Sequence, residues 1–359
     1  MITITFYKYY IIVVVLCKID LKKLVSCNIS NDLQTQLYPW YVLETTHIFQ
    51  NNKTNIIVSP KILNSLLKSS YTNEMKSLDS IKQVPGQTMT YIESKVNIRL
   101  PKYLEILRNN KIQKFIFRDD DILMEAINDW ANLVTNHKYT KMIESTTEIH
   151  ALPIYIINIY ESNELLLVDF KYKVNAEFYV TPKIRRRVPA VETTDNLQYL
   201  DSQVLDAKIL RLPYSNNMAL YILLPHTKNG AEELLSRLGY EQLKRIEWMM
   251  EEMTVNVVLP KFKSYFKIDF KENIIKQSNH RFNISLFDAF DNADVTRDKM
   301  NIFQANGINF NGTGNQLIEP IIRPAKYQKF HVDRPFVIYI EEETSGDIVC
   351  LGKILNPIL

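Results

Sequence analysis

The feature that most constrains the fold of this chain is a long connection near its C-terminus. An apolar, alternating run ends before Asn311, and another begins at Phe336, so we predict a strand on each side. The connection is rich in glycine at its start and is broken by prolines further on. Long connections in compact domains are usually functional or disordered. We therefore expect residues 311–331 to form a functional loop.

The bulk composition is that of a globular protein. The chain has 359 residues, 46% of them hydrophobic and 23% charged, and its net charge is +3. So small a net charge gives no reason to expect nucleic acid as a partner. We find no internal repeat and no low-complexity tract.

Predicted helices come first along the chain and predicted strands later. Helical patterns cover 32–49 and the segments that begin at Pro60, Pro101 and Asp119. A central strand follows at 154–160, and a second helix region is predicted at 231–238. Hairpins are predicted at 178–191, 209–225 and 336–351. This order favours an α+β fold over a doubly wound sheet.

The N-terminus has the pattern of a secretory signal peptide. Lys8 precedes a short apolar core that ends at Cys17, which predicts a signal peptide over 1–17 and a domain over 18–359. Cleavage after Cys27 and an uncleaved anchor helix are the alternatives. We expect a secreted protein with no membrane segment once the signal is removed.

Secretion would allow glycosylation and disulfide formation. Cys27 and Cys350 would then remain, and they either pair or stay as free thiols. The Asn-x-Ser/Thr triplets that could carry glycans begin at Asn28, Asn52, Asn283 and Asn311.

The sequence contains none of the motifs that commonly mark enzymes. The six histidines are scattered, and no zinc, EF-hand or nucleophile-elbow motif is present. The spacing from Gly307 to Thr313 is that of a phosphate loop, but Thr313 stands where the lysine is required. We therefore predict no enzyme, no metal and no cofactor.

A basic cluster stands in the first predicted hairpin. Lys183, Arg185, Arg186 and Arg187 lie close to the expected turn. Such a cluster could bind a polyanion, for example a glycosaminoglycan, or could be a solvated hairpin tip.

Several blocks of the chain resemble the signatures of the serpin family, and they follow one another in the order that the family shows. The resemblance spans residues 32–357. It implies a serpin fold, with a large mixed central sheet, a bundle of helices and smaller sheets, and a monomer. Ser59 and Asn158 would lie in the shutter, where the sheet opens. The blocks are 55–60, 127–138, 157–160, 210–225, 258–262, 287–294, 333–336 and 352–357.

The resemblance also implies a mechanism. An inhibitory serpin offers its reactive-centre loop to a serine protease, is cleaved, and inserts the loop into its central sheet as a new strand while the protease is still attached. Here the loop would cover about 311–331, with its hinge at Gly312, Thr313, Gly314 and Asn315. The candidate scissile residues are Arg323, Pro324, Lys326 and Gln328.

The front of this loop departs from the family pattern. Glu319 and Pro320 stand where small residues must become a central strand. Burying an unpaired glutamate is costly, and proline removes a ladder hydrogen bond. The segment 70–95 is also shortened, so the family's heparin site there does not carry over. We expect a secreted serpin with inefficient suicide inhibition. The alternatives are an inhibitor of trypsin-like proteases acting through Arg323 or Lys326, and a non-inhibitory polyanion-binding or carrier serpin.

Overall fold

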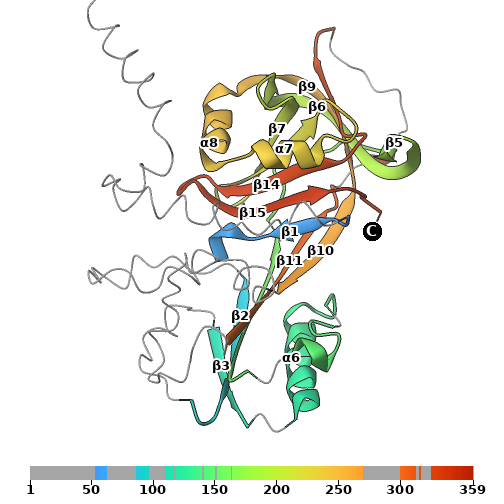
Figure 1. Ribbon diagram of the computed structural model, residues 1–359. Coiled ribbons are helices and arrows are strands. Elements are labelled where there is room, and N and C mark those ends of the chain that lie inside the picture. Colours follow the sequence, from blue (N-terminus) through green and yellow to red (C-terminus); the bar gives the residue numbers. More distant parts are fainter. Residues whose placement is uncertain are drawn as a thin grey trace, which may run out of the picture.

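Two β-sheets organise the computed structural model (Figure 1). The structure describes residues 53–62, 86–96, 110–116, 119–139, 141–149, 152–162, 164–269, 300–312, 315–316 and 325–358. The predicted signal peptide, the helix at 32–49, the helix from Pro101 and the glycosylation candidates Asn28, Asn52 and Asn283 lie outside these residues.

The five-stranded sheet is mixed, as predicted. Its strands are antiparallel except for the pairs β11–β4 and β2–β3, which are parallel. The predicted central strand is β4, the middle strand of the five. In order across the sheet the strands are β10 (Phe262–Asp269), β11 (Met300–Phe310), β4 (Ile154–Ser162), β2 (Gln87–Glu93) and β3 (Asn110–Phe115).

The ten-stranded sheet contains the three predicted hairpins. They are β5 with β6, β7 with β8, and β14 with β15, all antiparallel. Two further strands branch from the main path, since β9 (Glu251–Pro260) pairs with both β6 and β13 (Gln328–His331). The main path runs through β1 (Ile56–Val58), β15 (Asp347–Ile354), β14 (Phe336–Glu342), β8 (Met218–Pro225), β7 (Ala207–Tyr214), β6 (Ile184–Ser202), β5 (Tyr172–Thr181) and β12 (Asn315–Gln316).

Local turn chemistry explains why these hairpins could be predicted. Asn216 and Asn217 connect β7 to β8 with φ angles of 61° and 55°. Two successive residues with positive φ match the right-handed twist of the flanking strands, and asparagine adopts this conformation readily. Gly346 has a φ of 67° in the turn between β14 and β15. The turn residues therefore favour the observed register of the flanking strands through local geometry.

Few helices are present among the described residues. The helix α6 (Asp120–Val134) begins as predicted, because Oδ1 of Asp119 accepts a hydrogen bond from the Asp121 amide at 2.9 Å. Its buried face includes Leu123, Ile127 and Trp130 and packs against one face of the five-stranded sheet. The other helical segments among the described residues are the start of a helix at 60–62, as predicted from Pro60, together with α7 (Ala231–Arg237), α8 (Tyr240–Met249) and the short 3-10 helix η2 (Thr146–Glu148).

The one cysteine that the structure describes lies in the apolar core. Cys350 is fully buried in β15 and forms no disulfide with another described residue, while Cys27 lies outside them. Burial raises the pKa of the Cys350 thiol well above its usual range. The thiol is therefore protonated at neutral pH and shielded from oxidants.

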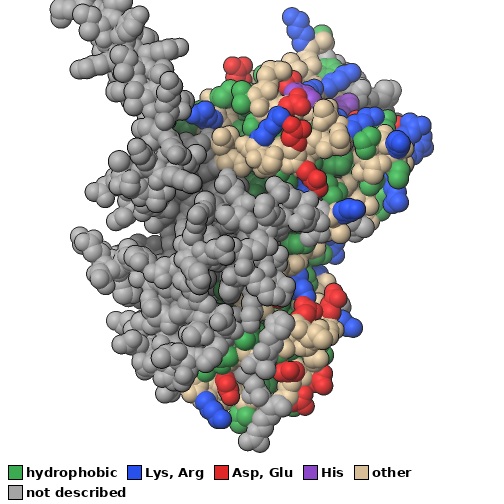
Figure 2. Space-filling model, viewed as in Figure 1, with side chains coloured by type: hydrophobic (Ala, Val, Ile, Leu, Met, Phe, Trp, Pro, Cys, Tyr) green, Lys and Arg blue, Asp and Glu red, His purple; other side chains and the backbone are tan. Residues whose placement is uncertain are grey.

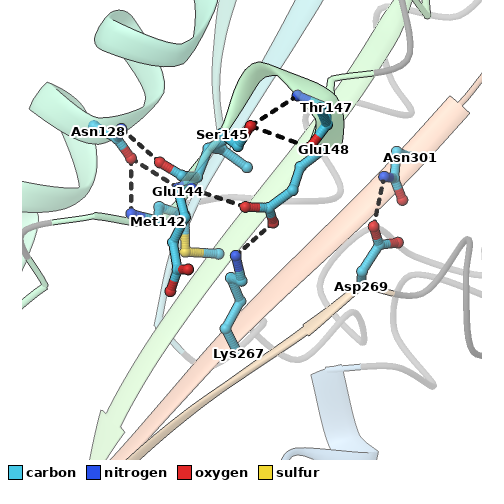
Figure 3. A network of polar contacts seen from close by, with 10 residues as sticks. Asn128, Met142, Glu144, Ser145, Thr147, Glu148, Lys267, Asp269 and Asn301 are labelled. Atoms are coloured by element: carbon cyan, nitrogen blue, oxygen red, sulfur yellow. Dashed lines mark hydrogen bonds and ion pairs between the residues drawn. The ribbon is translucent and has the colours of Figure 1, made fainter.

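A side-chain amide ties α6 to the segment that follows it (Figure 3). Oδ1 of Asn128 accepts hydrogen bonds from the amides of Met142 and Ile143 at 2.7 and 2.8 Å, and its Nδ2 donates to the Ile143 carbonyl at 2.9 Å. One side chain thus satisfies three backbone groups of a segment with no regular structure.

We predict that Asn128→Ala lowers the free energy of unfolding by about 2–3 kcal/mol, because it leaves partly buried backbone groups without partners. Urea denaturation would measure the loss. Asn132→Ala is the matched control on the same helix, since the Asn132 side chain bonds only the exposed His137 ring among the contacts observed. Equal losses in the two variants would contradict the role given to Asn128.

Candidate functional site

The central feature of the candidate site is the parallel pairing of β4 with β11. The two strands stay in register from the pair Met300–Ile154 to the pair Ile308–Ser162, and no described strand lies between them. The loop leaves the end of β11 at Phe310. A new strand could enter here only if β4 and β11 moved apart. The hydrogen bonds between these two strands would then be replaced by two rows, one from the new strand to each of them.

A buried polar cluster joins β11 to the start of the first described helix. The amide of Ser59 donates to Oε1 of Gln304 at 3.1 Å, and Nδ2 of Asn306 donates to the same oxygen at 2.7 Å. Oγ of Ser59 donates to the carbonyl of Val349 at 2.5 Å. It also accepts from the amide of Ile62 at 3.3 Å, which is the helix-capping contact expected of Ser59.

The two predicted shutter residues lie at the same level of the sheet. Asn158 is in register with Gln304 on one side and with Thr88 on the other. Its Nδ2 donates to Oγ1 of Thr88 at 2.9 Å. The structure therefore connects Ser59 to β11 through Gln304, and Asn158 to β2 through Thr88.

Gln304 was missed by the sequence analysis, although a signal existed. Gln304 and Asn306 are polar, two residues apart, and stand in the middle of β11 between apolar residues. Residues two apart on a strand share a face, and both side chains are fully buried. Oδ1 of Asn306 is itself buried and accepts no hydrogen bond from a described residue. Two polar residues on a buried face of a strand indicate that their side chains form hydrogen bonds with specific groups packed against that face.

A second contact crosses the boundary between β4 and β11. Tyr265 on β10, Gly307 on β11 and Glu161 on β4 stand in one row across three strands. The Tyr265 hydroxyl donates to Oε1 of Glu161 at 3.1 Å, so its side chain spans β11. Gly307 makes this crossing possible, because a Cβ there would lie 2.5 Å from Cε1 of Tyr265. We call this row the Tyr265 bridge.

The segment after α6 reinforces the Tyr265 bridge. Nζ of Lys138 lies 2.6 Å from Oε1 of Glu161, and the Tyr139 ring packs edge-on against Tyr265 with centroids 4.9 Å apart. The Tyr139 hydroxyl donates to the carbonyl of Asn306 at 3.1 Å. Burial, together with the nearby Glu161 charge, raises the pKa of Tyr265, which keeps its hydroxyl protonated as a donor.

An ion pair holds the next part of this segment on β10 (Figure 3). Nζ of Lys267 lies 2.6 Å from Oε2 of Glu148 in η2. Partial burial by itself would raise the pKa of the Glu148 carboxyl, but hydrogen bonds from Lys267 and from backbone amides, with the Lys267 charge, lower it overall. The segment that follows α6 is thus held against the five-stranded sheet near both of its ends, by Lys138 and Tyr139 at one end and by Glu148 at the other.

The described residues of the predicted hinge contact the ten-stranded sheet. Gly312 is buried, and a Cβ there would lie 3.0 Å from Cγ2 of Val191. Further on, Asn315 and Gln316 form β12, which pairs in parallel with Tyr172 and Lys173 at the edge of β5. Thr313 and Gly314 lie outside the described residues. The described backbone at Asn315 and Gln316 therefore extends the ten-stranded sheet and is not paired with β4 or β11.

The first residue of the connection is the one glycosylation candidate that the structure describes. Asn311 is exposed, and its Oδ1 accepts a hydrogen bond from Nζ of Lys261 at 2.9 Å. The side chain is thus open to solvent at the end of β11.

The C-terminal end of the loop lies earlier in the chain than the sequence predicted. Gln328, a candidate scissile residue, is the first residue of β13 and is in register with Val255, so the connection ends at Tyr327 and not at 331. Backbone pairing to β9 is what fixes this boundary. Lys326 is exposed just before β13. Arg323 and Pro324, like Glu319 and Pro320, lie outside the described residues.

A polar chain anchors β13 behind the loop. Nε2 of His331 and Oδ1 of Asn256 are 2.7 Å apart, and Nδ2 of Asn256 donates to Oε1 of the buried Glu192 at 2.9 Å. Three neighbouring strands, β13, β9 and β6, are thus linked through side chains as well as backbone.

Two further features of the described residues bear on function. None of the helices among them is long and apolar enough to cross a membrane. Within the same part of the chain, no group of three or more His, Cys, Asp or Glu side chains could hold a metal ion.

Comparison with known proteins identifies the family. The family model described as "Serpin (serine protease inhibitor)" matches residues 61–357. This match covers most of the chain, which therefore belongs to the serpin family, a family of protease inhibitors and not of enzymes.

The relatives are distant in sequence but close in fold. "Serine protease inhibitor 2" of Anopheles gambiae is 26% identical, over 87% of this chain and 89% of its own length. "Heparin cofactor 2" of Oryctolagus cuniculus is also 26% identical, but over only 51% of this chain and 39% of its own length. The solved structure of uncleaved ovalbumin matches with a TM-score of 0.72 at 18% identity, over 90% of this chain and 98% of that one. The predicted serpin fold is confirmed.

We predict that Gln304→Ala lowers the free energy of unfolding by about 2–3 kcal/mol, because it leaves the buried Ser59 amide and Asn306 Nδ2 without their acceptor. Thermal and urea unfolding would measure this loss. Gln198→Ala, on an exposed position of β6, is the matched control and should change the stability by less than about 0.5 kcal/mol. A Gln304 variant as stable as the control would contradict the cluster's role.

We also predict that Tyr265→Phe speeds the exchange of backbone amide hydrogens in β4 and β11. Removing the hydroxyl deletes the bond to Glu161 that spans the boundary, at a cost of about 1–2 kcal/mol, so the ladder opens more often. Hydrogen exchange read by mass spectrometry would detect the change. Asn309→Ala, on an exposed site of β11, should leave the exchange unaltered. Identical protection in Tyr265→Phe and the parent protein would rule out a role for the Tyr265 bridge.

Proposed function

We propose that this serpin is secreted and offers its reactive-centre loop to trypsin-like serine proteases, which cleave it without being trapped efficiently. The observation that carries this proposal is the sequence Glu319-Pro320 in the part of the loop that would have to enter between β4 and β11. Arg323 and Lys326 are the basic residues at which such proteases would cut, and Lys326 is exposed.

The physical conflict lies in what a strand between β4 and β11 requires. That position has a strand on each side and packed side chains on both faces of the sheet: the polar cluster of Ser59 and Gln304 on one, α6 on the other. A proline there leaves one ladder position without a donor. An inward-facing glutamate would have to be protonated or buried as an unpaired charge. Shifting the register by one residue turns the glutamate outward but leaves the proline in place.

The docked hinge adds a further cost. Because Asn315 and Gln316 pair with β5, they must give up those backbone hydrogen bonds before the loop can turn back into the five-stranded sheet. The Tyr265 bridge and the Ser59–Gln304 cluster resist the separation of β4 from β11 at the same time. Slow insertion gives the protease time to hydrolyse the acyl-enzyme and escape.

Two features support secretion, and a third supports a protease as the partner. The sequence has a signal-peptide pattern over 1–17, and Asn311 is an exposed glycosylation candidate. The name of the mosquito relative is that of a serine protease inhibitor. Efficient inhibition through Arg323 or Lys326 is the alternative within the same family.

A second candidate function is the binding of polyanions through the β5–β6 hairpin. Lys183, Arg185, Arg186 and Arg187 are all exposed at its end. One partial relative is named as a heparin cofactor, which agrees with this candidate.

The main proposal predicts the outcome of mixing the purified protein with trypsin at several molar ratios. We expect cleavage at Arg323 or Lys326, no covalent complex on a denaturing gel, and an unchanged melting temperature, because no strand is gained. Intact-mass measurement would locate the cut. A complex that survives SDS, formed in good yield by the parent protein, would sink the proposal.

A repaired loop provides the sharper comparison. In the variant Glu319→Ala/Pro320→Ala we expect cleavage to raise the melting temperature and a fraction of the trypsin to become trapped, because both obstacles to insertion are removed. Arg323→Ala/Lys326→Ala is the control that should resist cleavage in the loop. If the repaired variant behaves like the parent protein, the obstacle lies elsewhere than in these two residues.

A further inference from the structure

The pairing of β5 with β6 sorts the charges of the basic hairpin onto two faces. Residues opposite each other in an antiparallel pair share a face, and alternate residues along a strand do so as well. Arg187 is opposite Glu177, and Arg185 is opposite Tyr179. Arg185, Arg187 and Lys173 therefore point to one face of the hairpin, and all three are exposed.

Arg186 belongs to the opposite face. It is in register with Phe178, which is fully buried in the core. The basic cluster that is continuous in the sequence is thus divided in the fold, and Arg186 is separated from its neighbours.

Two lysines that the sequence analysis did not connect with the cluster join the first face. Lys171 is exposed and lies just before the first residue of β5, two residues from Lys173. Nζ of Lys228, from the turn after β8, lies 3.4 Å from the centroid of the Tyr179 ring, beside Arg185. Tertiary structure therefore lengthens the charged face at both ends.

The acidic groups near this face are few. Glu177 lies 3.0 Å from Nη1 of Arg185 and offsets part of its charge. Asp169 is exposed two residues before Lys171. Among the described residues of this face, the basic side chains Lys171, Lys173, Arg185, Arg187 and Lys228, with Lys183 at the turn, outnumber these two carboxylates.

The face is long and narrow. From Lys173 to the level of Tyr179 it extends along β5 over roughly 20 Å at about 3.4 Å per residue, while on β6 the same face becomes buried at Val191, opposite Lys173. Figure 2 shows Lys and Arg side chains gathered at the side of the molecule where Figure 1 labels β5. A linear, repeatedly charged ligand would match this row of cations better than a compact anion.

We propose that this face binds a linear sulfated polysaccharide lying along the β5–β6 hairpin. The inference deepens the second candidate function and rests on it. Sulfate groups spaced along a chain would meet the cations of β5 and β6 in turn, while Arg186 would take no part.

The chemistry of the face favours a polysaccharide over other polyanions. Binding of single-stranded nucleic acid usually relies on open aromatic rings for base stacking, and the Tyr179 ring is already covered by Lys228. Insertion into a membrane needs apolar side chains around the cations, and at this tip only Ile184, 52% exposed, has that character among the described residues.

The test is binding of size-defined heparin fragments to the purified full chain, measured by calorimetry at several NaCl concentrations. We expect Lys173→Ala/Arg185→Ala/Arg187→Ala to weaken binding at least about tenfold and to flatten its salt dependence, because three contacts with released counterions are lost. Arg186→Ala should change the dissociation constant by less than about twofold.

A charge-matched variant controls for the loss of net charge. Lys111→Ala/Lys114→Ala/Lys263→Ala removes three exposed lysines of the five-stranded sheet and should bind like the parent protein. Equal weakening in both triple variants, or a large effect of Arg186→Ala, would overturn the assignment of this face while leaving polyanion binding intact. No heparin binding by the parent protein at low salt would overturn polyanion binding itself.

Two competitors test the kind of ligand. Oligo-dT and vesicles containing anionic phosphatidylserine should bind more weakly than heparin at the same salt concentration. Binding of either at equal strength, with the same dependence on Lys173, Arg185 and Arg187, would overturn the preference for a polysaccharide. Unchanged melting temperatures would show that all variants are folded.

Discussion

The parallel ladder between β4 and β11 is the interaction on which the rest of this structure depends. Several contacts of the candidate site lie on these two strands: the Ser59–Gln304 cluster contacts β11 on one face, and α6 covers the other face. The Tyr265 bridge spans the boundary itself. Separating β4 from β11 would therefore break the bond between Tyr265 and Glu161 as well as the backbone ladder, which adds to the barrier to opening.

This barrier and the loop sequence act in the same direction. Insertion of a loop is favourable when the new strand packs well enough to repay the separation of the old ones. Here the entering strand would bring Glu319 and Pro320, and its hinge would first have to leave β5. Membership of the serpin family follows from the extent of the match and from the fold. Efficiency as an inhibitor depends instead on a few side chains within one strand, and these can change while the fold is kept.

The fold was predictable wherever a local pattern determines structure. The hairpins, the capped start of α6 at Asp119 and the central strand β4 depend on turn residues, a cap and an apolar run within a few positions of one another. Contacts between distant segments were not predictable. Tyr265 reaches Glu161 only because Gly307 lies between them in space, and Gln304 meets Ser59 across 245 positions of the chain. The end of the loop depended on the pairing of β13 with β9, which no local pattern encodes.

The fold class and the family resemblance could be derived from the order of residues along the chain, because local patterns and short motifs encode them. The faces that side chains share, the contacts that hold β4 against β11 and the pairing of Asn315 and Gln316 with β5 became apparent only from the folded chain, because they join segments that are distant in sequence. The basic hairpin illustrates the difference: three arginines are consecutive in the chain, yet cross-strand pairing places Arg186 opposite the buried Phe178 and the other two opposite Tyr179 and Glu177, on the other face. Strand pairing brings together residues that are far apart in the sequence and separates immediate neighbours.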